Sequence, residues 1–131
     1  MFTPDTFFQL ACAWALEHER TTVEDEEFLR DVIATGLRAN GYDVTEAGDG
    51  VEALGLMTEQ TAFQVLISDV IMPRMGGTEL AIKLTEINPS LKVFLMSGTE
   101  THPDVAYVAI EFFRKPFAMR SLIAGLNRLE Q

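Results

Sequence analysis

The sequence has little positive charge, a single cysteine and no long apolar run. Ten Lys and Arg residues stand against twenty Asp and Glu residues, so the 131-residue chain has a formal net charge of −10. Binding to nucleic-acid phosphates or to an anionic membrane surface requires clustered basic side chains. We therefore expect neither nucleic acid nor membrane among its partners, whereas the acidic excess is compatible with a divalent cation.

The lone cysteine and the hydropathy pattern bear on the compartment. Cys12 has no second cysteine with which to form an internal disulfide, which fits a reducing cytoplasm. No apolar stretch approaches the ~20 residues of a membrane helix, and no signal-peptide pattern is present. We expect a cytoplasmic protein with one domain, a size that can bury a substantial core.

One buried strand that ends in a carboxylate is the most informative stretch. Val65, Leu66 and Ile67 form an apolar run of the kind found in parallel strands that are buried on both faces. Asp69 stands at the end of this run, before a turn rich in Met, Pro and Gly. Open α/β sheets place their chemistry at the carboxyl ends of strands, so Asp69 is a candidate functional residue. Taken alone, a helix-capping aspartate explains it equally well.

Strand-like and helix-like segments alternate along the chain. Strands are predicted over 20–23, 42–47, 63–68, 91–96 and 110–114, and helices over 28–40, 51–57, 78–87 and 119–129. This alternation implies a parallel sheet with right-handed crossovers. We expect an α/β fold with a flavodoxin-like, doubly wound, five-stranded parallel sheet of order 2-1-3-4-5 and helices on both faces.

An extra N-terminal helix is predicted over residues 1–19, ahead of a domain that spans 20–131. Pro4 suits a first helical position, and apolar residues follow at helical spacing, namely Phe7, Leu10, Ala11 and Trp14. Its apolar face could cover its own domain, a partner or a second copy in a homodimer, and the sequence leaves this open. The first strand looks weak for a central position, because Val23 is its only aliphatic residue.

Four motifs in this order resemble the receiver domain of two-component response regulators. They are Glu24-Asp25-Glu26, Ser68-Asp69-Val70-Ile71-Met72-Pro73, Met96-Ser97-Gly98 and Arg114-Lys115-Pro116-Phe117, within a resemblance that runs from about Thr21 to Leu129. No single motif is specific to this family, but the four motifs together in this order are. The segment between Ser97 and Lys115 is shorter than in a typical receiver, so a short or absent fourth helix is expected.

The resemblance implies a chemistry for Asp69. Asp69 would be the nucleophile that accepts a phosphoryl group, assisted by the Lys115 ammonium and the Ser97 hydroxyl. Gly98 would leave room beside the phosphoryl group. By the same resemblance, Ser97 and Phe112 would form the switch that reports phosphorylation.

The resemblance also implies a magnesium site. The ligands would be the carboxylates of Glu24, Asp25 and Asp69, with Glu24 acting directly or through water, and the backbone carbonyl of Ile71. Mg²⁺ is a hard cation that prefers such oxygen ligands, and it would relieve the repulsion among the carboxylates. Read singly, the acidic run could instead be a solvated helix start favoured by the helix dipole.

The sequence is compatible with three functions to different degrees. The leading one is a signalling receiver that takes its phosphoryl group from a histidine kinase or a phosphotransfer protein. It would act on a downstream protein target by conformational change or by phosphorelay, and would catalyse only its own phosphorylation and a slow dephosphorylation. The alternative is a phosphorylation-independent adaptor or dimerisation module with an impaired switch. A metal-dependent phosphatase is disfavoured, because Ile71 stands where a second carboxylate would be needed.

Overall fold

Five parallel strands form one sheet in the order β2-β1-β3-β4-β5. The computed structural model describes residues 8–13, 23–59, 63–72, 74–98, 105–115 and 117–129. The strands are β1 (Phe8–Ala13), β2 (Tyr42–Ala47), β3 (Val65–Asp69), β4 (Lys92–Ser97) and β5 (Glu111–Arg114). The sheet order and the α/β class agree with the prediction from the sequence.

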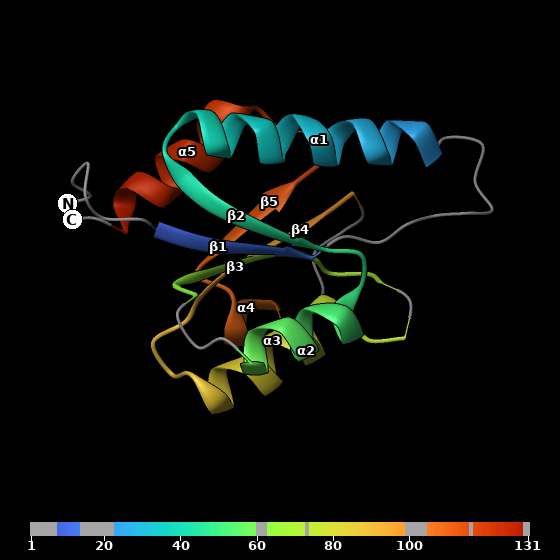
Figure 1. The fold of residues 1–131 in the computed structure, drawn as a ribbon, viewed down its shortest axis with the longest axis vertical. Helices are drawn as coiled ribbons and strands as arrows, with labels where there is room; N and C mark the ends of the chain where they lie inside the picture. Colours follow the sequence, from blue (N-terminus) through green and yellow to red (C-terminus); the bar gives the residue numbers. More distant parts are fainter. Residues whose placement is uncertain are drawn as a thin grey trace.

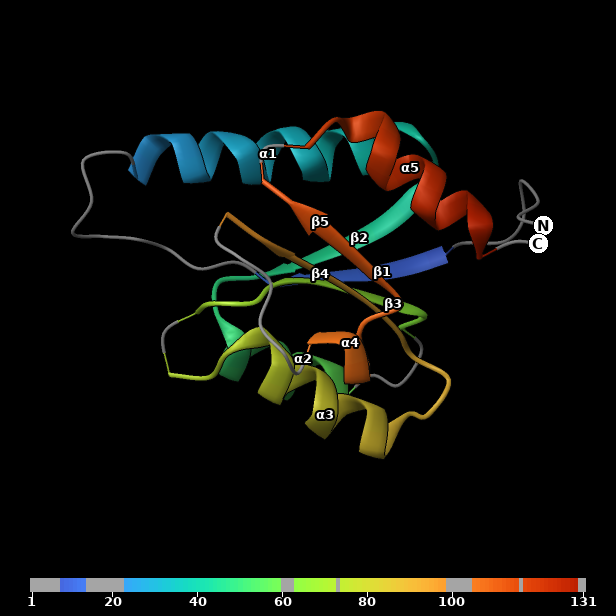
Figure 2. The ribbon, with the colours of Figure 1, turned by 180° about the vertical axis from the view of Figure 1, so that it is seen from behind.

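Helices cover both faces of the sheet. They are α1 (Val23–Ala39), α2 (Gly50–Glu59), α3 (Gly77–Ile87), α4 (Val105–Val108) and α5 (Met119–Arg128). Helices α1 and α5 lie on one face, and α2, α3 and α4 lie on the other (Figures 1 and 2). Helix α4 has four residues, which confirms the expectation of a short fourth helix. No helix in the described part of the chain is long and apolar enough to cross a membrane.

The central strand differs from the one expected. The structure forms β1 from Phe8–Ala13, where the sequence predicted a helix, and α1 already begins at Val23 within the predicted first strand over 20–23. Both predictions are therefore wrong for these residues. β1 pairs along its length with β2 and also pairs with β3. A central parallel strand favours a near-continuous apolar run, which Phe8–Ala13 provides and residues 20–23 lack.

This correction moves the acidic pair relative to the sheet. Glu24 and Asp25 lie in the first turn of α1, rather than directly after the end of a strand. Residues 14–22 separate them from the end of β1 and lie outside the described residues, as do most of residues 1–19. The strand expected at 20–23 is thus supplied by the segment assigned to the N-terminal extension. The predicted homodimer contact through an N-terminal helix loses its basis, because Phe8–Ala13 form a strand inside the sheet.

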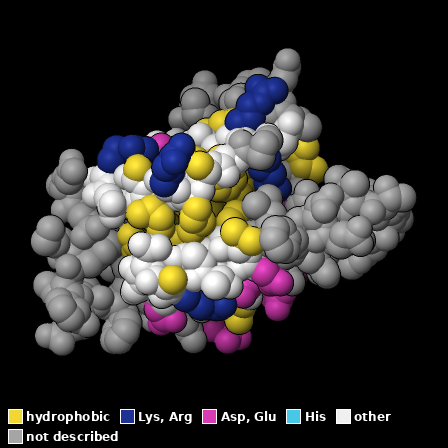
Figure 3. All heavy atoms as spheres, turned by 90° about the horizontal axis from the view of Figure 1, so that it is seen from above, with side chains coloured by type: hydrophobic (Ala, Val, Ile, Leu, Met, Phe, Trp, Pro, Cys, Tyr) yellow, Lys and Arg dark blue, Asp and Glu magenta, His cyan; other side chains and the backbone are white. Residues whose placement is uncertain are grey.

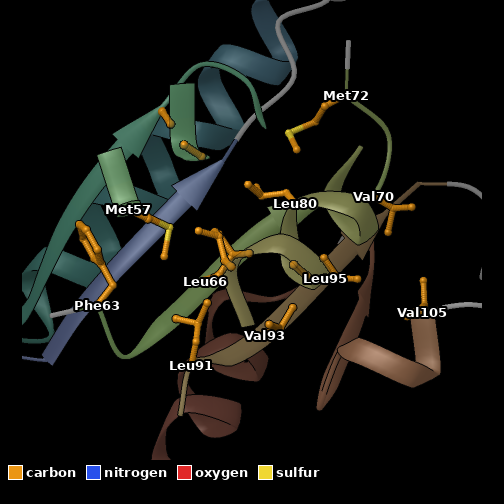
Figure 4. Packing of buried hydrophobic residues seen from close by; sticks show 14 residues of the cluster. Met57, Phe63, Leu66, Val70, Met72, Leu80, Leu91, Val93, Leu95 and Val105 are labelled. Carbon is orange, nitrogen blue, oxygen red and sulfur yellow. The ribbon is translucent and has the colours of Figure 1, made fainter. Parts of the chain in front are cut away.

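Two hydrophobic clusters hold the layers together. One lies between the sheet and α2, α3 and α4, with side chains such as Leu66, Leu80 and Leu95 turned towards one another (Figure 4). The other lies between the sheet and α1 and α5, around Ile67 and Phe94. Successive residues of β3 and β4 therefore point into opposite clusters, as the period of a strand requires, and both strands are buried throughout apart from Lys92.

The face formed by α1 and α5 also carries hydrophobic side chains near its surface. They gather in the middle of this face (Figure 3). The partly buried residues that pack on the cluster beneath come from α5 and its flanks, namely Phe117, Met119, Ile123 and Leu129. The edge that bears Asp69 lies elsewhere, at the carboxyl ends of the strands.

Candidate functional site

The carboxyl ends of β3, β4 and β5 meet at one edge of the sheet. β3 ends at Asp69, β4 ends at Ser97, and Lys115 follows β5 directly. The Lys115 backbone N–H donates to the Ser97 carbonyl at 2.9 Å, and the Val70 N–H donates to the Met96 carbonyl at 2.9 Å. These bonds continue the strand pairing past the last residues of the strands. They fix the three predicted phosphorylation residues relative to one another.

Asp69 and Lys115 form a nearly buried ion pair. Lys115 Nζ lies 2.6 Å from Asp69 Oδ1, and the side chains are 15% and 6% exposed, respectively. A carboxylate as buried as Asp69 is costly unless a cation balances it, and Lys115 supplies that cation. The structure thus brings together two of the predicted site residues. A carboxylate beside an ammonium is also the arrangement that transfer of an anionic phosphoryl group requires.

Ser97 and Gly98 border this ion pair. The Ser97 side chain is buried, with 5% of the residue exposed. Among the described residues, a Cβ built on Gly98 would meet the Lys115 Cβ at 4.0 Å. The role of Gly98 in leaving room beside Asp69 stays a prediction. Motion of Ser97 during a switch stays a prediction.

Two residues that the sequence prediction missed hold the Asp69 backbone in place. The Ser68 hydroxyl, which is fully buried, donates to the Asp69 carbonyl at 2.8 Å. Gly77, the first residue of α3, packs so closely that an added Cβ would lie 2.0 Å from the same carbonyl oxygen. Only a residue without a side chain fits there. The Gly76-Gly77 pair in the sequence indicated a turn, but nothing in the pattern indicated which atom it approaches.

The loop after β3 carries the predicted metal-binding carbonyl of Ile71. Val70 and Met72 are buried and 7% exposed, whereas Ile71 between them is 57% exposed. The two buried neighbours belong to the cluster on the α2–α4 side (Figure 4). This anchoring leaves the Ile71 side chain facing solvent.

The described residues suit magnesium in the type of atom that they offer. The Asp69 carboxylate and the Ile71 carbonyl are oxygen donors, which Mg²⁺ prefers. The side chains of Glu24 and Asp25 lie outside the described part, although their backbone belongs to α1. Among the side chains that the structure describes, no group of three or more His, Cys, Asp or Glu could hold a metal ion. The full ligand set of Glu24, Asp25, Asp69 and Ile71 therefore stays a prediction.

Phe112 lies on β5, three residues before Lys115. It is half-buried and packs against the cluster on the α2–α4 side of the sheet. Its position in the sheet is opposite Leu95 of β4. The aromatic ring thus sits between the core and the surface, where a predicted switch residue would need to be.

Comparison with known proteins places this chain in a family. The model of the response regulator receiver domain matches residues 21–127. The response regulator receiver protein CpdR of Brucella abortus is 33% identical over 110 residues, which cover 81% of this chain and 91% of CpdR. The sensor kinase CckA of the same organism is 34% identical over 82% of this chain but 12% of its own length. Other curated relatives, such as TcrX of Mycobacterium tuberculosis, are about twice as long as the matched region, which covers 47% of TcrX.

Solved structures give the same assignment. The receiver domain of the hybrid histidine kinase CckA is 31% identical, with a TM-score of 0.72 over 94% of this chain and 99% of that domain. The response regulator protein TrrA of Thermotoga maritima, at 21% identity, shares the fold with a TM-score of 0.75 over 95% of this chain and 99% of TrrA. The motifs around Asp69, Ser97 and Lys115 lie at one edge of a fold that these proteins share. The chain belongs to the response regulator receiver domain family.

Proposed function

We propose that the chain accepts a phosphoryl group on Asp69 in a Mg²⁺-dependent reaction. The observation that carries the proposal is the 2.6 Å contact between Lys115 Nζ and Asp69 Oδ1, at the edge where Ser97 ends the neighbouring strand. Family membership supports the same chemistry. TrrA, which shares the fold, was solved in complex with Mg²⁺-BeF.

Each residue at the edge has a definite task in the reaction. A carboxylate oxygen of Asp69 forms a bond to phosphorus, while the bond between phosphorus and the donor's nitrogen or oxygen breaks and its electron pair leaves with the donor. The Lys115 ammonium offsets the negative charge on the phosphoryl oxygens, and the Ser97 hydroxyl donates a hydrogen bond to one of them. When bound, Mg²⁺ supplies further positive charge to those oxygens.

The phosphoryl donor is a histidine kinase or a phosphotransfer protein. The matched relatives include a receiver protein and a sensor kinase, which are components of two-component systems. The product would act on a downstream protein target through a change of conformation at Ser97 and Phe112, or would pass its phosphoryl group onward. Its catalysis is confined to its own phosphorylation and dephosphorylation, and its compartment is the cytoplasm.

Slow loss of the phosphoryl group is part of the proposal. The exposed side chain beside the acceptor is Ile71, which is 57% exposed and has no polar atom to orient an attacking water. Hydrolysis of the acyl phosphate would therefore gain little help from this side chain.

Intact-protein mass spectrometry after incubation with acetyl phosphate tests the proposal. Wild type should gain one phosphoryl group when Mg²⁺ is present and none when it is chelated. Asp69→Asn should gain none, whereas the matched control Asp43→Asn, at an exposed position of β2, should behave as wild type.

Failure of the wild-type protein to gain mass would overturn the proposal. The second candidate, a phosphorylation-independent adaptor, would then take its place. It is favoured by one observation, that Glu24 and Asp25 lie in α1 rather than directly after β1.

A further inference from the structure

The loop between β3 and α3, residues 70–76, is held firmly at its two ends. We call it the acceptor loop; its residue 73 lies outside the described part. At its start, the Val70 N–H donates to the Met96 carbonyl at 2.9 Å. At its end, the Gly77 N–H donates back to the Val70 carbonyl at 2.8 Å. The loop therefore closes on itself beside Asp69. Met72 is buried in the cluster on the α2–α4 side, and a second anchor holds the part of the loop that follows it.

Arg74 provides that anchor in an unfavourable backbone conformation. Its φ of 68° is the one positive value for a non-glycine residue in the described part of the chain. The left-handed region costs free energy for any residue with a Cβ, so glycine would suit the turn better. The Arg74 guanidinium, however, donates to Oδ2 of Asp49 and forms an ion pair with it. Arginine at this position is therefore strained in its backbone, but it makes an ion pair that glycine cannot make.

Asp49 is itself fixed, because its two carboxylate oxygens bind different elements. Oδ1 accepts the Glu52 backbone N–H at 2.9 Å and so caps the start of α2. The Glu52 carboxylate in turn accepts the Gly48 N–H at 2.6 Å, which completes a reciprocal cap. Oδ2 remains for Arg74. The side chain therefore joins a rigid helix start to the acceptor loop.

The backbones of the two elements also meet closely. A Cβ built on Gly50, the residue after Asp49, would lie 2.6 Å from the Met75 carbonyl oxygen and 3.1 Å from the Met75 Cβ. The absence of a side chain at Gly50 lets the start of α2 approach the acceptor loop. The ion pair thus spans a close backbone contact, although the pair itself is on the surface, with the Arg74 side chain 62% and the Asp49 side chain 22% exposed.

We propose that Asp49 is a positioning residue that, through Arg74, holds the acceptor loop so that the Ile71 carbonyl stays in place to bind Mg²⁺. This inference rests on the proposed function and names a residue outside the motifs that indicated it. Asp49 touches neither the phosphoryl group nor the metal. Its effect is on how well the loop is ordered before Mg²⁺ binds, and hence on metal affinity.

Calorimetric titration with MgCl₂ alone tests the inference. Asp49→Asn keeps an oxygen to cap α2 but removes the charge that holds Arg74, and Arg74→Gly removes both the contact and the backbone strain. Each should weaken Mg²⁺ binding about threefold, the scale that loss of a solvent-exposed ion pair supports. The matched control is Glu111→Gln, which removes the same charge from a surface ion pair with Arg128 on β5 and α5. Its affinity should equal that of wild type.

Two further measurements separate positioning from other roles. Arg74→Gly should keep the wild-type urea midpoint, because relief of strain offsets the lost ion pair, whereas a merely structural contact would lower stability and affinity together. At saturating Mg²⁺, phosphorylation of Asp49→Asn by acetyl phosphate should return to the wild-type rate, since the chemistry at Asp69 is untouched. A rate that stays low at saturation would overturn the positioning role.

The outcomes for the inference and for the proposed function differ. Suppose that wild type binds Mg²⁺ and is phosphorylated, but that Asp49→Asn and Arg74→Gly bind Mg²⁺ as tightly as Glu111→Gln. The positioning role of Asp49 is then refuted, and the proposed function stands. If wild type binds no Mg²⁺, the proposed function and the inference fall together.

Discussion

Replacing Gly77 by alanine should destabilise the protein, because the added methyl group has no room. Its Cβ would lie 2.0 Å from the Asp69 carbonyl oxygen and 2.9 Å from the Ser68 Oγ. The carbonyl belongs to the last residue of β3, and the Gly77 N–H is bonded to the Val70 carbonyl at 2.8 Å. The added Cβ would be fixed to the backbone of α3 and would meet a backbone carbonyl, and hydrogen bonds hold both segments, so neither can yield at low cost.

The size of the effect follows from two opposing contributions. Overpacking a well-packed site costs about 1–3 kcal/mol, and more where backbone must shift. Alanine regains up to ~1 kcal/mol over glycine in a helix, although Gly77 is at the first position of α3. Because the added Cβ meets a backbone carbonyl and not a flexible side chain, the overpacking cost outweighs the gain in helix propensity. We expect a net loss of about 2 kcal/mol in the free energy of unfolding. With a urea m-value of about 2 kcal/mol/M, the midpoint should fall by about 1 M.

Urea unfolding followed by circular dichroism measures this difference. Gly55→Ala is the matched control, because Gly55 lies in α2 and a Cβ there would have no neighbour within 4 Å among the residues that the structure describes. That variant should be stabilised by up to ~1 kcal/mol. If Gly77→Ala unfolded at the wild-type midpoint or above it, the close packing of α3 against the Asp69 backbone would be refuted.

Three further predictions concern β1, the ion pair and pH. Deletion of residues 1–13 removes β1 from between β2 and β3 and should abolish the cooperative unfolding transition in urea. If the deletion variant stayed folded, residues 20–23 would be able to supply the central strand. A double-mutant cycle of Asp69→Asn and Lys115→Gln in Mg²⁺-free buffer should give a coupling of about 1–3 kcal/mol, because the pair is nearly buried, and a coupling near zero would contradict the 2.6 Å contact. The Glu52 N–H, with help from Arg74 and against the effect of burial, holds the pKa of Asp49 below its ordinary value of 3.8. The stability that Asp49 contributes is therefore fully present above that value and is lost as the pH falls below it. The difference in urea midpoint between wild type and Asp49→Ala should shrink over that range, and a constant difference would contradict the assigned hydrogen bonds.

The sequence predicted the site better than it predicted the central strand. Asp69, Ser97 and Lys115 each follow a run of strand-forming residues, and parallel strands bring their carboxyl ends to one edge. Their meeting was therefore predictable from order and spacing. The residues of β1 were not, because the apolar run around Phe8–Ala13 fits helical spacing as well as a buried strand, and periodicity cannot separate the two.

The contacts that support the site could not be predicted from the sequence. Asp49 and Arg74 are 25 positions apart, and nothing in a Gly-Asp-Gly turn or a Met-Pro-Arg turn shows that they pair. The approach of Gly77 to the Asp69 carbonyl depends likewise on the packing of α3 on the sheet. Spacing along the chain indicates which residues share an edge, whereas distances between backbone atoms come only from the fold.

Chemical localisation of the phosphoryl group tests the central claim most directly. Borohydride reduces an acyl phosphate and leaves a free carboxylate intact, so it converts a phosphorylated aspartate to homoserine. The wild-type protein would be treated with acetyl phosphate and Mg²⁺, reduced, digested and sequenced by tandem mass spectrometry. Homoserine at position 69, absent when Mg²⁺ is chelated, is the predicted result. A reduced side chain at Glu24, Asp25 or another acidic residue instead, or none at all, would contradict the assignment of Asp69 as the phosphoryl acceptor.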